Sequence, residues 1–235
     1  MSAQRTHNIG GFLMFYVPPK EIRDMPCNGC PQFKIDIDIF DWPLNTRIYC
    51  GSKMVSFGNP SNDNIEDVLK ELLNECPRSR GKTLIAHLEE TTFFKDPASA
   101  KYHGACEHGL QTHSWNVLHN LRELTSKHNL TWTDKESMEI IALAHDMCKI
   151  GAYIPDGNGG YTYAYPRDRG HGDVSLKLAR AVIPLTEEEE LCIRWHMGPY
   201  DNKENWPKFN AAIKKYPNVF WTFIADMMAS QFDEV

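Results

Sequence analysis

Apolar residues recur at helical spacing through most of this chain, and that periodicity restricts it to a largely helical fold. The first such segment, NIEDVLKELLNEC, begins at Asn64 and places its aliphatic side chains on one helix face. Further segments have the same spacing and a local start signal, at about residues 105–128, 134–150, 173–183, 186–197, 207–215 and 217–231. We therefore predict that residues 65–235 form one mainly α domain.

The helix starts carry residues with known capping roles. Thr186 followed by Glu189 fits a capping box, in which each residue satisfies a backbone N–H of the other. Asp173 is placed to cap the helix after GHG, and Pro217 suits the first turn of the last helix. The acidic run TEEEE needs no bound cation, because the helix dipole favours carboxylates in a first turn.

The first part of the chain, residues 1–64, has a different pattern. KIDIDIF alternates apolar and polar residues with period two, and TRIYCGSKMVSFGNP is typical of a strand ending in turn residues. We predict a small β-containing segment here, which shapes the pocket, contacts a partner protein or forms an oligomer interface. Cys27 and Cys30 have a zinc-like or redox-like spacing, but no second CxxC follows, so ordinary thiols are favoured.

Composition narrows the class of protein. The charged fraction of 24% and hydrophobic fraction of 42% are typical of a soluble globular protein, and no segment reaches the roughly 18 apolar residues of a membrane span. The 7 Cys are an odd number of scattered residues, which favours reduced thiols and a cytoplasmic protein. A net charge of -6 disfavours duplex DNA as a partner.

Polar residues end one of the predicted core helices. The stretch ALAHDMCKIG finishes an apolar run with His145, Asp146 and Lys149. A His-Asp pair alone says little, but His113 lies in the preceding amphipathic helix. Asp226 lies in the apolar segment PNVFWTFIADMMAS, where an unpaired buried carboxylate would be costly. Imidazoles and carboxylates together bind divalent transition metals and leave positions open for water and substrate.

Other residues are weaker candidates for the same site. His171 in GHGDVS and His196 in IRWHMGPYD follow the His-Asp pair at loop or helix ends, and they are candidates for holding a second ion. The alternative for His196 is a bond to the last carbonyls of its helix, and for Asp226 a bond to an Arg or hydroxyl. Lys149 is either a solvated helix-end lysine or a phosphate-contacting group one turn beyond His145.

These residues resemble the HD superfamily of metal-dependent phosphohydrolases. The resemblance rests on His113, the His145-Asp146 pair and Asp226 in that order, and it extends over roughly residues 85–231 through DPASAKYHGACEHGLQTHS, GHGDVS and IRWHMGPYD. His108 stands where similar sequences more often have Gly, and Met-Cys follows the His-Asp pair where Ile-Gly is more usual. Neither departure removes a candidate ligand.

The resemblance implies an all-helical HD fold and a metal site. His113, His145, Asp146 and Asp226 would hold one ion, and residues such as His171 and His196 often hold a second. The ligand types do not choose among Mn, Fe, Co, Ni and Zn. The resemblance supports catalytic roles for Asp146 and Lys149. His103 and Arg169 are weaker candidates for binding the substrate phosphate, since polar loop residues are common without such a role.

The expected reaction is hydrolysis of a nucleotide or related phosphoester by metal-activated water. One alternative is a phosphodiesterase or exonuclease acting on cyclic or oligomeric nucleotides. Another is a non-catalytic regulatory module that binds a nucleotide. The Gly-, Pro- and Tyr-rich stretch 151–172 is predicted to be a loop or short hairpin, in which Tyr161, Tyr163 and Tyr165 either stack on a nucleobase or pack on the domain.

Overall fold

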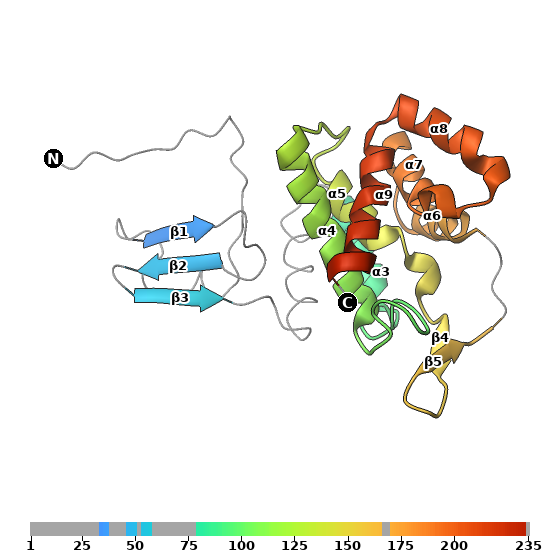
Figure 1. Cartoon of the computed structure of the whole chain (residues 1–235), viewed down its shortest axis with the longest axis horizontal. Helices are drawn as coiled ribbons and strands as arrows, with labels where there is room; N and C mark the ends of the chain where they lie inside the picture. Colours follow the sequence, from blue (N-terminus) through green and yellow to red (C-terminus); the bar gives the residue numbers. More distant parts are fainter. Residues whose placement is uncertain (1–32, 38–45, 51–52, 58–78, 166–169, 234–235) are drawn as a thin grey trace. The chain divides into compact units, whose positions relative to one another are not determined.

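The computed structural model describes residues 33–37, 46–50, 53–57, 79–165 and 170–233. The chain divides into two compact units, Met1–Asn59 and Pro60–Val235 (Figure 1). The predicted domain boundary after residue 64 and the helix predicted from residue 65 both lie outside the described residues, as do Cys27, Cys30 and Arg169. The boundary after residue 64 therefore stays a prediction.

The first unit contains a three-stranded antiparallel sheet, where the sequence had predicted a small β-containing segment with two strand-like stretches. Its strands are β1 (Phe33–Ile37), β2 (Thr46–Cys50) and β3 (Lys53–Phe57), in the order β1-β2-β3. Ile35 is the register partner of Ile48, which in turn is the partner of Val55. The small β-containing segment is thus confirmed.

The second unit is mainly helical, which confirms the predicted fold class. Its α-helices are α3 (Ser79–Glu89), α4 (Gly109–His128), α5 (Ser137–Ala144), α6 (His171–Val182), α7 (Glu187–Trp195), α8 (Trp206–Lys215) and α9 (Asn218–Met228). Short 3-10 turns lie at η1 (Met147–Lys149), η2 (Gly198–Tyr200) and η3 (Lys203–Asn205), and a π-helical turn, η4 (Ala229–Asp233), follows α9. No described helix has the length and apolar character needed to cross a membrane.

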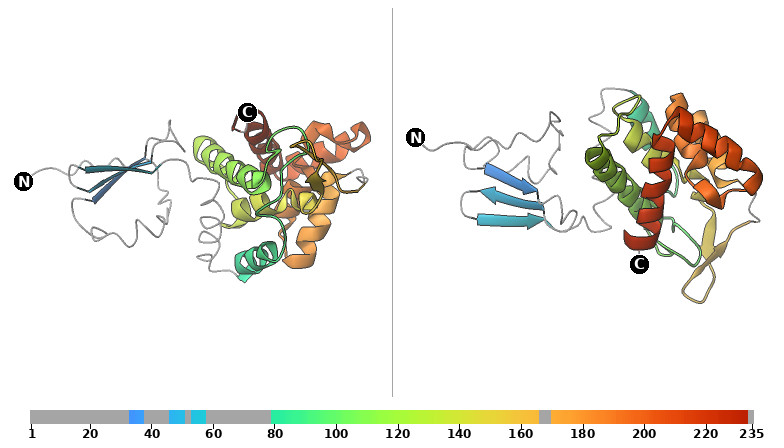
Figure 2. Two further views of the ribbon diagram at one scale, coloured as in Figure 1. Left: turned by 90° about the horizontal axis from the view of Figure 1, so that it is seen from below. Right: turned by 45° about the horizontal axis from the view of Figure 1, so that its top comes forward.

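The core lies where α4 packs against α5 and α9, and α7 packs against α6 and α9. The three views agree that α4 and α9 lie side by side, far apart as they are in the sequence (Figures 1 and 2). The fully buried aliphatic residues of α4 include Leu110, Leu118 and Leu121, and they meet Ile140 and Ile141 of α5 in one apolar cluster. The same helices position the polar residues His113, His145, Asp146 and Asp226 at the edge of this apolar cluster.

The helix boundaries differ from the predictions at two informative places. The helix predicted over 134–150 stops at Ala144, because the backbone of Asp146 (φ -112, ψ 21) leaves the helical region before η1 begins. Asp173 was predicted to cap α6, and this is wrong. The helix begins at His171 after Gly170, whose φ of 114 favours glycine, and Asp173 lies inside the first turn where it pairs with Arg194.

Other local predictions hold, apart from the exact place of Pro217. Thr186 and Glu189 form the capping box at the start of α7. Pro217 is the N-cap residue directly before α9, one position ahead of the first turn in which it was predicted. The segment 151–172 contains a hairpin of β4 (Tyr153–Pro155) and β5 (Tyr161–Tyr163). Helix α3, with the sequence SRGKTLIAHLE, was not among the predicted helices.

Candidate metal centre

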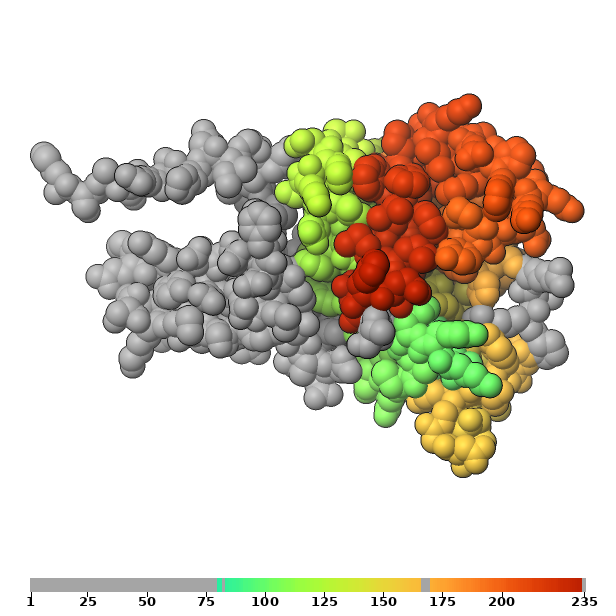
Figure 3. All heavy atoms as spheres, viewed as in Figure 1, coloured from blue at the N-terminus to red at the C-terminus, as the bar shows by residue number. Residues whose placement is uncertain are grey.

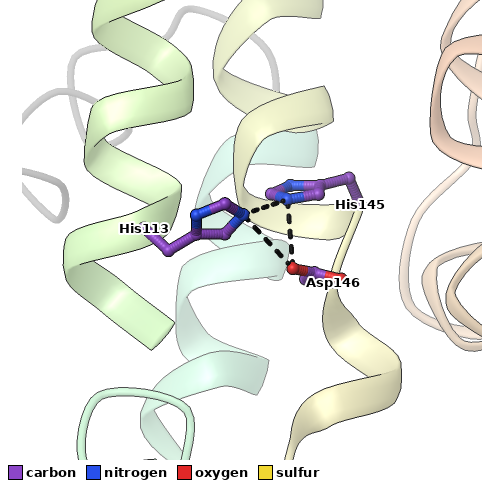
Figure 4. Close-up of side chains that lie close together, drawn as sticks. All are labelled: His113, His145 and Asp146. Carbon is purple, nitrogen blue, oxygen red and sulfur yellow. Dashed lines mark hydrogen bonds and ion pairs between the residues drawn. The ribbon is translucent and has the colours of Figure 1, made fainter. Parts of the chain in front are cut away.

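Two helices bring the first three donor residues together. His113 lies on the buried side of α4, and its side chain has no solvent exposure. His145 ends α5 and Asp146 follows it, both almost completely buried. The three side chains point toward one another (Figure 4). The Nε2 atoms of His113 and His145 are 3.2 Å apart, and Asp146 Oδ2 lies 3.4 Å and 3.3 Å from them.

This spacing fits a metal ion. Their ligand atoms all lie within 4.8 Å of one another. Imidazole nitrogens and carboxylate oxygens bind zinc and similar ions at about 2.1 Å, so two donors on one ion lie roughly 3 Å apart. The observed separations are therefore those of atoms that can share a single ion.

Asp226 and His196 adjoin these three residues from two more helices. Asp226 of α9 places its Oδ1 atom 3.1 Å from His113 Nε2, and only 13% of its side chain is exposed. His196, directly after α7, places its Nε2 atom 3.6 Å from Asp146 Oδ1. Its ring lies 5.1 Å from that of His145, centroid to centroid. Residues separated by more than 110 positions in the sequence are thus neighbours.

The two helix-end histidines have their tautomers fixed in the same way. Nδ1 of His145 lies 2.8 Å from the carbonyl oxygen of Ala142, and Nδ1 of His196 lies 2.7 Å from that of Ile193. A carbonyl oxygen only accepts, so each Nδ1 donates, and Nε2 of the neutral ring carries a lone pair. His196 Nε2 is buried and makes no hydrogen bond. Buried lone pairs beside carboxylates are suited to a cation.

The carboxylates are anionic at neutral pH. Burial raises the pKa of Asp146, but Lys149 and the neighbouring histidines outweigh it and hold the pKa well below its usual range. Burial also opposes ionisation of Asp226, yet its hydrogen bond with His113 and the nearby imidazoles lower its pKa to about 2. The site therefore presents two negative charges, of which Asp146 is paired directly with the Lys149 ammonium at 2.7 Å.

Lys149 lies inside the site and is not a solvated helix-end lysine. It belongs to η1, one turn beyond Asp146, and only 9% of the residue is exposed. Burial favours the neutral amine, but the charge of Asp146 and the hydrogen bond to it raise the pKa of Lys149 above its usual value. The ammonium group is therefore kept protonated beside the donor cluster.

The remaining predicted residues are placed differently. The half-buried ring of His103 lies 5.0 Å from that of His113, so the loop before α4 reaches the cluster. His171 starts α6, and its Nδ1 lies 3.6 Å from the thiol of Cys148. The structure thus brings His196 to Asp146, whereas His171 lies beside Cys148, which belongs to the Met-Cys pair where similar sequences more often have Ile-Gly.

The comparison with known protein families matches residues 110–220 to the HD domain. The region spans the helices that supply His113, His145, Asp146 and His196. Residues 110–220 form an HD domain. No curated protein matches the chain, and no solved structure matches it either.

The HD domain gives the site its broad chemistry. HD domains belong to a superfamily of metal-dependent phosphohydrolases and bind divalent metals, and the buried cluster of His113, His145 and Asp146 is compatible with such an ion. Asp226 lies six residues beyond the matched region, on α9. The assignment of individual ligands stays a prediction that this geometry supports.

Proposed function

We propose that the protein hydrolyses a phosphoester of a nucleotide or a related small molecule, using a divalent transition metal. The observation that supports this most directly is the convergence of buried imidazole Nε2 atoms, two ionised carboxylates and one ammonium group, all from residues 110–220 except Asp226 of α9. Such a set can hold a cation and a phosphoryl group at the same place.

The proposed ligands of one ion are His113, His145, Asp146 and Asp226. The ion is Mn, Fe, Co, Ni or Zn, since all of these accept imidazole and carboxylate ligands. His196 is proposed to bind a second ion through its Nε2 lone pair, near Asp146 Oδ1. His171 is a weaker candidate for the second ion, because its position beside Cys148 gives it another partner.

A bound divalent cation would supply Lewis acidity and lower the pKa of water enough to give hydroxide near neutral pH. The chain's own residues then have distinct roles. The carbonyl oxygens of Ala142 and Ile193 orient His145 and His196 through their Nδ1 atoms. Asp146 holds Lys149, whose ammonium has further N–H donors for a phosphoryl oxygen. Such preorganised donors stabilise charge that develops during phosphoryl transfer.

Substrate recognition beyond the phosphorus is a further part of the proposal. His103 is proposed to contact the phosphate, since its ring lies against that of His113, and Arg169 is retained from the sequence prediction. Cyclic or oligomeric nucleotides, and nucleotide binding without turnover, are the alternatives. We propose that the protein acts in the cytoplasm on a small molecule.

The test is a hydrolysis panel. Nucleoside mono-, di- and triphosphates and cyclic dinucleotides are incubated with each of the five metals, and released phosphate or nucleoside is measured. Wild type is compared with Asp146→Asn, which keeps the side-chain size but removes a charge and a ligand. Glu187→Gln is the matched control, because Glu187 is an exposed carboxylate paired with Lys215 away from the site.

We expect turnover in wild type and Glu187→Gln, loss of at least a hundredfold in Asp146→Asn, and a product pattern that identifies the bond cleaved. Metal content measured on the same samples should fall in Asp146→Asn alone. Equal turnover in metal-free Asp146→Asn and wild type would refute the mechanism. If wild type binds metal but shows no turnover with any of the five metals, the nucleotide-binding alternative is favoured.

A further inference from the structure

The hairpin β4–β5 follows the proposed phosphate-binding lysine almost directly. The backbone N–H of Ala152 donates to the carbonyl oxygen of Lys149 at 3.0 Å, which closes a turn between η1 and β4. The N–H of Ala164 donates to Ala152 O at 3.0 Å, so the returning strand is fixed to the same point. The hairpin projects from the helical body next to the loop that precedes α4 (Figures 1 and 3).

That loop also fixes the base of the hairpin. Asp96 Oδ2 accepts a hydrogen bond from the backbone N–H of Gly151 at 2.6 Å and another from the Thr92 hydroxyl at 2.6 Å. Gly151 has a positive φ of 63, a conformation that favours glycine. The hairpin is therefore held at both of its ends beside η1.

One face of the hairpin is aromatic. Tyr153 is the register partner of Tyr163, and Pro155 is the partner of Tyr161. Paired residues of an antiparallel ladder lie on the same face, and their neighbours Ile154 and Thr162 lie on the other. The rings of Tyr153 and Tyr163 pack with centroids 5.3 Å apart and an interplanar angle of 37°.

The start of this aromatic face packs against the body of the domain. Tyr153 is only 7% exposed, whereas Pro155 further along the same face is exposed. Tyr153 directly follows Ala152, whose backbone N–H donates to the carbonyl oxygen of Lys149, so the backbone places Tyr153 beside η1.

Tyr163 differs from Tyr153 in its exposure. It lies on the same face, yet 48% of it is exposed to solvent. An aromatic ring that is held by packing on one side and accessible on another can stack on a nucleobase, and such stacking tolerates any base because every base has a π-face. Hydrogen bonds that choose one base are not required for this.

We propose that Tyr163, supported from below by Tyr153, is the surface on which the nucleobase of the substrate stacks while its phosphate reaches Lys149. This rests on the proposed function, because it takes the phosphate to lie in the metal centre. It commits the site to phosphoesters that carry a base, and it makes Tyr163 a binding residue with no part in the chemical step.

The test uses nucleosides, which have no phosphoester, so its outcome does not depend on hydrolysis. Adenosine, guanosine, cytidine and uridine are titrated against the full-length, metal-loaded protein, and binding is followed by saturation transfer to the base protons. Ribose serves as the ligand without a base. Tyr163→Phe retains the ring, Tyr163→Leu retains apolar bulk on Tyr153, and Thr162→Ala changes the opposite face of the same strand.

We expect nucleoside affinity to fall about tenfold in Tyr163→Leu and to stay within about twofold of wild type in Tyr163→Phe and Thr162→Ala. Ribose should give no transfer. Equal nucleoside affinity in wild type and Tyr163→Leu would overturn the proposal, as would the absence of nucleoside binding to wild type.

The two proposals fail separately. Nucleoside binding that depends on Tyr163, with no hydrolysis of any phosphoester, would support the stacking surface and refute the phosphohydrolase activity. Hydrolysis of nucleotides with the same kcat/KM in wild type and Tyr163→Leu would support the phosphohydrolase and refute the stacking surface. In the expected case, Tyr163→Leu raises KM for nucleotides about tenfold with little change in kcat, because stacking contributes equally to the ground and transition states.

Discussion

At the scale of single residues, His145 and His196 are oriented by the same kind of hydrogen bond. Each follows the last turn of its helix, donates from Nδ1 to the carbonyl oxygen three residues earlier, and thereby directs Nε2 into the cluster. For His196, a hydrogen bond to a carbonyl oxygen of its helix had been the alternative to metal binding. The structure shows that hydrogen bond on Nδ1, while Nε2 lies beside Asp146. One ring nitrogen of a histidine can donate to a carbonyl oxygen while the other binds a metal ion.

Lys149→Gln is expected to reduce kcat and leave the metal bound. The ammonium contacts Asp146 at 2.7 Å, so its loss removes charge stabilisation from the phosphoryl group without removing an imidazole ligand. The cost should be on the order of 10²–10³ in kcat, as for other preorganised donors. Metal analysis and steady-state kinetics measure the two effects. Lys215→Gln, outside the site, is the control, and a full loss of metal in Lys149→Gln would contradict this role.

His119 on α4 should make stability depend on pH. Burial and, to a smaller extent, Arg122 lower its pKa from 6.5 to about 4. Between these values the unfolded chain binds a proton that the folded chain does not, so the free energy of unfolding decreases as pH falls from 6.5 toward 4. Because its side chain is 18% exposed, solvent reduces the effect to about 2 kcal/mol.

Urea unfolding of wild type and His119→Gln at pH 7 and pH 4.5 tests this dependence. Other acidic groups contribute to both proteins, so the difference between the two curves isolates His119. The variant should lose less stability on acidification than wild type. Parallel pH profiles would show that His119 is not the group responsible.

At the scale of elements, a buried ion pair joins α3 to α7. Arg80 donates to Glu189 through two nitrogens at 2.6 and 3.0 Å, and the hydroxyl of Ser137 on α5 donates to the same carboxylate. Glu189 also completes the capping box with Thr186. The carboxylate has no solvent exposure and Arg80 has 6%. One side chain therefore ties three helices together.

Glu189→Ala should lower the free energy of unfolding by about 3–5 kcal/mol, because it removes the bidentate partner of the buried Arg80 guanidinium and leaves Asp134, at 3.4 Å, as the remaining carboxylate. The adjacent Glu190 offers a matched control, since its pair with Arg180 is largely exposed. Glu190→Ala should cost less than about 1 kcal/mol. Denaturant unfolding of both variants measures the contrast, and equal costs would show that burial does not decide the strength of these pairs.

Metal binding should act at the scale of the whole domain. The proposed ligands come from α4, from the residues after α5 and from α9, so an ion can hold them together only in the folded chain. An ion at about a hundred times its Kd adds about 2.7 kcal/mol to stability. For a domain of this size that is a rise in Tm of about 5–10 °C.

Thermal unfolding with and without each metal tests this, with EDTA as the reference. Wild type should show the rise in Tm and Asp146→Asn should not. A similar rise in both proteins would place the stabilising ion elsewhere. Because the readout is stability, it reports on the ion independently of any substrate.

Much of the fold followed from the sequence, and part of the site did. The 3.6-residue periodicity located six of the helices described in the second unit, and the capping box marked the start of α7. The break after Ala144 was missed, because apolar spacing continues through Met147, which is also buried. Helix α3 was also missed, and the pair that ties it to α7, Arg80 with Glu189, joins residues 109 positions apart, a contact that local spacing does not indicate.

The sequence by itself determined the helical class of the domain, the order His113, His145-Asp146, Asp226 and the aromatic alternation after Gly151, because spacing and residue type are local properties. Only the tertiary structure distinguished His196, which lies beside Asp146, from His171, which lies beside Cys148. It alone placed Lys149 inside the site and gave Tyr153 and Tyr163 one shared face. These contacts join positions far apart in the chain, or depend on which face packs inward, and helix packing and strand register decide both.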